Sequence, residues 1–201
     1  MCIYHADLPA DPTIRRILLI KWNAMGDVII ATALFEDIDR AFPDREIHLD
    51  TQPGWQSLFA ADARFQRILT VDWNDRRQRI RQIATWLRQV RAWNYDLVID
   101  LQCNDRSRFL LSLLWLSGQR IRYRLGNRRQ FPYNIAPAEL PKPSHILLRS
   151  RAALQAGSIP TTTLRPVLHI PERNRTHASD LIQRHGLSPS GYAIFLPGCN
   201  A

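Results

Sequence analysis

An aliphatic run that passes through a short loop into a helical pattern constrains the fold more than any other stretch. Residues 17–20 are all aliphatic, which predicts a strand buried on both faces, as in a parallel sheet. A loop follows from Lys21 to Gly26, and from Asp27 the apolar residues recur at helical spacing. The stretch therefore predicts a strand–loop–helix unit, and open α/β sheets bind ligands at such loops.

The rest of the chain alternates between strand and helix patterns. Further strands are predicted at residues 46–50, 67–71, 95–101 and 120–124. Further helices are predicted at residues 55–61, 75–91, 106–115 and 144–156. Because this alternation requires right-handed crossovers, we expect an α/β protein with a Rossmann-like parallel sheet and helices on both faces.

The opening loop excludes two classes of nucleotide-binding protein. Its only glycine is Gly26, so it contains neither the G-x-G-x-x-G dinucleotide turn nor the G-x-x-x-x-G-K-[ST] phosphate loop. A nicotinamide-dependent enzyme or a P-loop NTPase is therefore not expected. Gly26 would instead let another molecule approach the backbone closely.

Asp27 has two interpretations at the start of the predicted helix. Aspartate is preferred there because its carboxylate caps unpaired backbone N–H groups and suits the helix dipole. The same dipole favours the ionised carboxylate at neutral pH, which could then accept a proton in catalysis. From the residues alone capping is the commoner role, and the catalytic role stays open.

The amino-acid composition indicates which kinds of partner the protein can bind and in which cellular compartment it works. The net charge of +9 and pI of about 10.3 indicate an anionic partner: nucleic acid, an acidic membrane surface or a phosphorylated substrate. Cys2, Cys103 and Cys199 have no metal-ligand spacing and no even disulfide framework, which suits a reducing cytoplasm. The N-terminus lacks a signal-peptide pattern and no apolar stretch is long enough to span a bilayer, so any membrane contact would be peripheral.

Changes in composition and periodicity along the sequence predict three segments. Residues 1–13 contain two prolines and little periodicity, so they predict a loose leader, and residues 14–164 contain the alternating elements of a first domain. Residues 165–201 comprise a proline-flanked linker, a polar helix at 172–185 and an apolar strand at 192–196. Because no helix follows that strand, we expect a second α/β domain that begins near residue 165 and is truncated at Ala201.

The helix predicted at residues 75–91 is rich in arginine. Its expected buried stripe is made of apolar residues at helical spacing, namely Ile80, Ile83, Ala84, Leu87 and Val90. The remaining faces carry arginine, which fits either a solvated surface or contact with a membrane surface or an anionic ligand. The sequence leaves these two interpretations open.

Three segments resemble glycosyltransferase family 9, the lipopolysaccharide heptosyltransferases. Residues 17–27, with Lys21 and Ala24-Met-Gly-Asp27, are similar to the first-strand motif of that family. Tyr95-Asp-Leu-Val-Ile-Asp-Leu-Gln102 resembles its Tyr-Asp-x-x-Ile-Asp-x-Gln-Gly segment, with Cys103 at the position of the glycine. Residues 192–198 resemble the first strand and Pro-Gly turn of its donor domain. The order and spacing fit the N-terminal acceptor domain and the start of the donor domain, over about residues 15–201.

The resemblance implies a GT-B arrangement, in which this chain is the N-terminal half. It implies an inverting glycosyltransferase that moves a heptose from a nucleotide sugar, with ADP-heptose as the expected donor, to an acidic phosphorylated glycolipid. Asp27 would be the general base, and no metal or other cofactor is implied. Such an enzyme works in the cytoplasm, peripherally at the cytoplasmic face of the inner membrane. As a fragment without a donor domain, the chain is expected to be inactive.

The resemblance also assigns binding roles. The candidates for acceptor binding are Lys21, Gly26, Arg128 and Arg129. The first two lie in the opening loop, and the two arginines lie in a loop that is expected to border the same cleft, where the arginine fork suits carboxylate and phosphate. The candidates for donor binding, in the turn after the last predicted strand, are Gly198, Cys199 and Asn200.

Two other functions remain as alternatives. The chain could be a non-catalytic module that binds an anionic glycolipid or a membrane surface. Nucleic-acid binding through the arginine-rich helix ranks lowest, because no aromatic-plus-basic recognition motif accompanies the charge, so no nucleic-acid partner is expected.

Overall fold

The centre of the molecule is a five-stranded parallel sheet. The computed structural model describes residues 5–73, 75, 77–139, 145–188 and 191–192. Its strands lie in the order β3-β2-β1-β4-β5, and every neighbouring pair is parallel. Their bounds are β1 (Arg16–Ile20), β2 (Glu46–Thr51), β3 (Arg67–Thr70), β4 (Leu97–Asp100) and β5 (Tyr123–Leu125). The first strand is therefore central, and the polar strand β5 lies at an edge.

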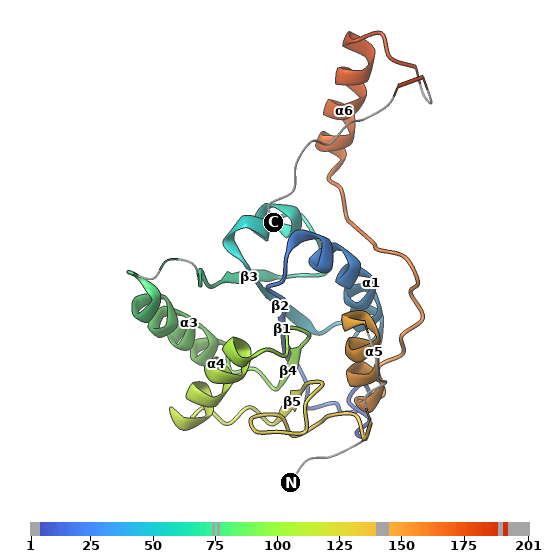
Figure 1. Ribbon diagram of the computed structural model, residues 1–201. Helices are drawn as coiled ribbons and strands as arrows, with labels where there is room; N and C mark the ends of the chain where they lie inside the picture. Colours follow the sequence, from blue (N-terminus) through green and yellow to red (C-terminus); the bar gives the residue numbers. More distant parts are fainter. Residues whose placement is uncertain (1–4, 74, 76, 140–144, 189–190, 193–201) are drawn as a thin grey trace. The chain divides into compact units, whose positions relative to one another are not determined.

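Helices cover both faces of this sheet (Figure 1). One face carries α1 (Met25–Ala41) and α5 (Ile146–Ala156), and the other carries α3 (Arg79–Trp93) and α4 (Asp105–Leu116). A short turn of 3-10 helix, η1 (Pro53–Trp55), and α2 (Gln56–Phe59) follow β2. This confirms the predicted fold class of a Rossmann-like parallel sheet between two helical layers.

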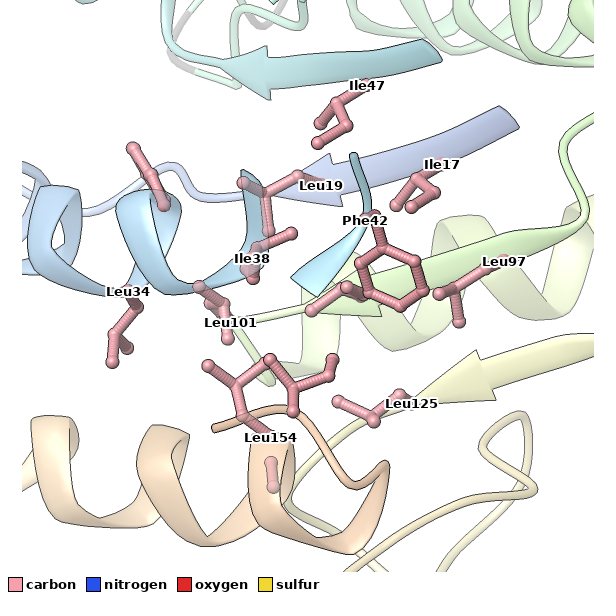
Figure 2. Close-up of a cluster of buried hydrophobic side chains, with 14 of the residues drawn as sticks. Ile17, Leu19, Leu34, Ile38, Phe42, Ile47, Leu97, Leu101, Leu125 and Leu154 are labelled. Carbon is pink, nitrogen blue, oxygen red and sulfur yellow. The ribbon is translucent and has the colours of Figure 1, made fainter. Parts of the chain in front are cut away.

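The aliphatic run in β1 is buried on both sides, as its composition predicted. Ile17 and Leu19 face the layer of α1 and α5, whereas Leu18 and Ile20 face α3 and α4. All four side chains have no exposed surface. Figure 2 shows the first of these clusters, in which Leu34 and Ile38 of α1 and Leu154 of α5 pack over the sheet.

The arginine-rich helix begins four residues later than predicted. Asp75 Oδ1 accepts hydrogen bonds from the backbone N–H groups of Arg77 and Gln78, a local turn that competes with helix formation. The helix α3 starts at Arg79, and Ile80, which was assigned to its buried stripe, is 85% exposed in the first turn. The buried centre of the helix is instead Trp86, together with Val90.

The described part of the leader is not loose. The backbone N–H of Ala6 donates to Ala156 O at 2.9 Å, and that of Leu8 donates to Gly157 O at 3.2 Å. The Leu8 side chain is buried in the core cluster, and Tyr123 donates a hydrogen bond to Asp11 Oδ2. Residues 5–13 are thus part of the first domain, because apolar side chains and backbone bonds hold them to α5 and β5.

The first unit also extends further than predicted, to Leu168 rather than to residue 164. Asp37 on α1 accepts hydrogen bonds at Oδ1 from the backbone N–H and hydroxyl groups of Thr162 and Thr163. Val167 N–H donates to the Thr32 hydroxyl, and its carbonyl accepts from Arg64. The chain is therefore held to the first unit over residues 162–167, which include the start of the predicted linker.

The second unit, His169–Ala201, contains the helix α6 (Glu172–Arg184). None of the residues of α6 is buried. The predicted strand at 192–196 lies outside the described residues except for Tyr192. Across the described residues no helix is both long and apolar enough to cross a membrane.

Candidate active site

The loop between β1 and α1 is held in place by side chains from the two neighbouring strands. Gln102, after β4, accepts a hydrogen bond at Oε1 from the Trp22 backbone N–H at 2.9 Å. Gln52, after β2, donates to the Trp22 carbonyl, and Trp55 Nε1 donates to the Asn23 carbonyl at 3.0 Å. The backbone of the loop is thereby fixed at the carboxyl edge of the sheet, where α/β proteins bind their ligands.

Asp27 lies in the first turn of α1, but it does not cap the helix. The N-cap position is Ala24, and no side chain there bonds the free N–H groups. Asp27 Oδ2 instead accepts a hydrogen bond from Asn23 Nδ2 at 2.8 Å. The carboxylate is half-buried, and within the described chain its Oδ1 accepts no hydrogen bond. The commoner interpretation of Asp27 as a helix cap is thus not realised, and one carboxylate oxygen is left for another partner.

Gly26 precedes Asp27 and is exposed on the same turn. A Cβ atom built at this position would meet no atom within 4 Å. The space around Gly26 is therefore open, and the chain itself does not require a glycine there.

Lys21, a predicted acceptor ligand, lies below the loop rather than on its surface. Its side chain is 2% exposed, and its Nζ is 3.4 Å from the Leu101 carbonyl, to which it donates. Burial lowers the pKa of Lys21, and the nearby Asp27, Cys103 and Asp100 oppose that shift. In this conformation Lys21 supports the site from inside and offers no charge to a ligand at the surface.

Asp100 connects the loop after β4 with the loop after β5. It is fully buried, and its carboxylate accepts hydrogen bonds from the backbone N–H groups of Gln102 and Cys103 and from the Tyr133 hydroxyl. Burial raises the pKa of Asp100. Asn127 N–H then donates to Cys103 Sγ at 3.1 Å. This network ties the loop after β5 to the loop that holds Trp22.

Cys103 explains why a glycine was expected at its position. Its φ of 44° lies in the left-handed region, which glycine adopts at the least cost. The thiol donates to the Asp100 carbonyl and is 5% exposed. The cysteine therefore makes hydrogen bonds inside the protein. Burial raises the pKa of its thiol well above the usual value.

A cavity of about 850 Å³ opens in the loop after β5. It is lined by residues 127–130 and 137–139, so both predicted arginines, Arg128 and Arg129, contribute to it. Arg128 also forms an ion pair with Asp105 at 3.1 Å, and Arg129 Nε donates to the Pro137 carbonyl. Asn127 is 3% exposed, and within the described chain its Oδ1 has no hydrogen-bond partner. Two arginines that also bond within the chain therefore line the cavity.

The structure places the predicted catalytic residue and the predicted acceptor residues in two groups at the same edge of the sheet. Lys21, Gly26 and Asp27 follow β1, whereas Arg128 and Arg129 follow β5. The loop after β4 joins the two groups through the contacts of Gln102 and Cys103. The predicted donor residues Gly198, Cys199 and Asn200 lie outside the described residues.

Two contributors were not predicted from the sequence. Asn23 orients Asp27 through a hydrogen bond. The spacing of four residues between them is a sequence signal from which this contact could have been predicted. Asp50, at the end of β2, is fully buried and accepts a hydrogen bond from Trp86 Nε1 at 2.6 Å. Burial raises the pKa of Asp50 to about 7.

Comparison with known proteins identifies the same fold in solved glycosyltransferases. No protein-family model matches the sequence, and a sequence search of curated proteins finds no match. A family 9 glycosyltransferase from Veillonella parvula superposes with a TM-score of 0.70 and 23% identity over 87% of this chain and 51% of that chain. The E. coli heptosyltransferase WaaC, solved with ADP-2-deoxy-2-fluoro heptose, superposes with a TM-score of 0.57 and 18% identity. The match covers 75% of this chain and 51% of that chain. The E. coli ADP-heptose LPS heptosyltransferase II superposes with a TM-score of 0.60 and 18% identity. The match covers 86% of this chain and 51% of that chain.

These matches confirm the predicted resemblance at the level of the fold, which is that of GT-B glycosyltransferases. The chain spans about half the length of the solved structures that it matches. The shared fold does not by itself determine the activity, because one fold can serve many activities.

Proposed function

We propose that this chain is the acceptor-binding half of an inverting glycosyltransferase of the family 9 type. The observation that carries the proposal is the placement of Asp27. The carboxylate stands at the carboxyl edge of the sheet and is oriented by Asn23, and it is not consumed in capping its own helix. A half-buried carboxylate in such a place can serve as a general base toward a bound hydroxyl group.

The reaction would proceed by a single displacement. Asp27 takes the proton of an acceptor hydroxyl as that oxygen attacks the anomeric carbon of the activated sugar. A new C–O bond forms with inversion, and the bond to the nucleoside diphosphate breaks. Asp27 need not be a strong base if proton transfer comes late, when the attacking hydroxyl has become acidic.

The acceptor would be an acidic, phosphorylated glycolipid. The cavity beside Arg128 and Arg129 supports this class of ligand, because guanidinium groups bind phosphate and carboxylate through paired N–H donors. The buried Lys21 would act on the reaction only through the positions of Asp27 and the loop.

The donor would be a nucleotide sugar, with heptose as the sugar and ADP as the nucleotide. Support comes from the fold shared with E. coli WaaC, which was solved with ADP-2-deoxy-2-fluoro heptose and with ADP. We propose that the donor site requires a second α/β half, to which Gly198, Cys199 and Asn200 would contribute, and that the 201 residues alone do not catalyse transfer. The site of action would be cytoplasmic, at the membrane face where the glycolipid lies.

The test uses the first unit, Met1–Leu168, fused to a family 9 donor domain, with ADP-heptose and a de-acylated, phosphorylated core-sugar acceptor. Asp27→Asn should lower turnover about 10²- to 10⁴-fold, the range for loss of a general base, while acceptor binding stays within about 2-fold. The matched control is Asp44→Asn, at a surface turn away from the edge that carries Asp27. Equal turnover by Asp27→Asn and the unmodified fusion would refute the role of Asp27.

A binding module without chemistry is the second candidate, because the basic cavity lies wholly within the first unit. Acceptor binding by the 201-residue chain that depends on Arg129, together with no turnover in any fusion, would favour it. Turnover that depends on Asp27 would exclude it.

A further inference from the structure

The outer side of α4 carries apolar side chains that the fold does not use. The inner side of this helix packs Ser107, Leu110, Leu111 and Leu114 into the protein. Its outer side presents Phe109, Leu113 and Leu116 at spacings of four and three residues, which aligns them on one stripe. Phe109 is 50% and Leu116 71% exposed. A surface helix normally carries polar residues on this side, so the stripe indicates a contact outside the fold.

A second exposed apolar contact lies where α4 meets the loop after β5. Phe131 is 51% exposed and packs edge-on against Trp115 of α4, with ring centroids 5.3 Å apart. We call Phe109, Leu113, Trp115, Leu116 and Phe131 the α4 patch. Phe131 follows Gln130, which lines the basic cavity, so the patch and the cavity share one loop.

Arginines surround the α4 patch. Arg120 places its guanidinium 5.7 Å from the ring centroid of Trp115, and Arg108 Nη2 donates a hydrogen bond to the Phe131 carbonyl. Arg108 and Arg128 both pair with Asp105, so among the described residues three arginines and one carboxylate are placed beside the patch. The rim of the patch is therefore net positive.

We propose that the α4 patch docks the protein on an anionic lipid bilayer. Apolar and aromatic side chains surrounded by arginine are suited to the boundary between acyl chains and acidic headgroups, where arginine can reach the phosphates. A second copy of this chain fits less well, because a two-fold contact would set the arginine rim against itself. The inference rests on the proposed function in one respect: a lipid-anchored acceptor would then reach the cavity from the surface on which the protein sits.

The experiment is vesicle flotation with the 201-residue chain. Phosphatidylcholine vesicles are compared with vesicles of phosphatidylcholine and phosphatidylglycerol. We expect binding to the anionic vesicles only, and a drop of at least about 5-fold in the bound fraction for Phe109→Gln/Leu116→Gln, which removes two apolar anchors. The matched control is Leu148→Gln on α5, a residue 47% exposed on the opposite side of the sheet. Circular dichroism confirms that each variant is folded.

Three results would overturn the inference. In the first, the double variant binds anionic vesicles as well as the unmodified chain does. In the second, the unmodified chain binds neutral vesicles as well as it binds anionic ones. In the third, size-exclusion chromatography shows a dimer of the unmodified chain that the double variant does not form. Binding of a de-acylated, phosphorylated acceptor separates this inference from the proposed function. If that binding persists in the double variant while flotation never occurs, only the membrane inference fails. If flotation depends on the patch and no acceptor binds, only the proposed function fails.

Discussion

Asn23 donates its side-chain amide to Asp27 Oδ2 across the first turn of α1, at 2.8 Å. The carbonyl of Asn23 is in turn fixed by Trp55 Nε1. One residue thus connects the backbone of the loop with the orientation of the proposed base.

Asn23→Ala should therefore lower turnover of the fused transferase by about 10-fold, because a misplaced base loses part of its effect. The KM for the acceptor should change by less than about 2-fold, since the amide bonds the base and not the acceptor. Steady-state kinetics of Asn23→Ala and Asp27→Asn, singly and combined, provide the check. If the double variant is no slower than Asp27→Asn, Asn23 acts through Asp27; independent, multiplying losses would contradict that.

Asp50 should make stability depend on pH in an unusual direction. Burial raises its pKa from 3.8 to about 7, so between these values the folded protein holds a proton that the unfolded chain has lost. The contribution of Asp50 to the free energy of unfolding therefore falls as pH rises through this window, by up to about 4 kcal/mol. Asp50→Asn keeps an oxygen for Trp86 and should remove that fall.

Urea denaturation at pH 4.5 and 7.5 measures the effect of Asp50. The control is Asp44→Asn on the surface, which should retain the pH dependence of the unmodified protein. An identical slope in Asp50→Asn and the unmodified chain would disprove the assignment.

Arg64 should contribute far more to stability than Arg40, although both pair with Glu36. Arg64 has a side chain only 3% exposed and also binds both carboxylate oxygens of Asp62. Arg64→Leu leaves the buried Asp62 carboxylate without its ion-pair partner and should cost about 3–5 kcal/mol. Arg40→Leu, whose side chain is 61% exposed, should cost no more than about 1 kcal/mol. Similar losses in the two variants, measured by urea denaturation, would refute this ranking.

Cys103 should be chemically inert in the folded protein. It is buried, and its thiol pKa is raised well above the usual value, so little thiolate forms. Iodoacetamide at pH 8 should leave Cys103 unmodified in native protein and should modify it in urea. Peptide mass spectrometry distinguishes it from Cys2 and Cys199, which act as internal comparators. Labelling of Cys103 at equal rates with and without urea would contradict the buried assignment.

The sheet could be predicted because the residues of its strands have a recognisable composition and periodicity. The aliphatic residues 17–20 are buried whichever face they point to, so periodicity and composition suffice. The start of α3 was misplaced because Asp75 forms local hydrogen bonds that a helical pattern does not reveal. Residues 5–13 showed no periodicity, and their burial depends on backbone bonds to α5, which is distant in sequence.

The site was harder to predict than the fold. Asp27 could be singled out by its place after β1, but the partner that orients it depends on the path of the loop. Lys21 is predicted to bind the acceptor because it lies in the opening loop, but its side chain is buried beside Asp27 and Asp100, which come from α1 and β4. The pairing of Trp86 with Asp50 joins residues 36 positions apart in the sequence, so no local pattern could indicate it.

Asp37 has a consequence for where a shortened form of the first unit can end. Because its carboxylate anchors Thr162 and Thr163, and Thr32 and Arg64 anchor Val167, the chain is bound to the first unit up to residue 167. An end at residue 164 would remove the Val167 carbonyl from Arg64 and the Val167 N–H group from Thr32. A stable truncation should therefore keep the chain through Leu168.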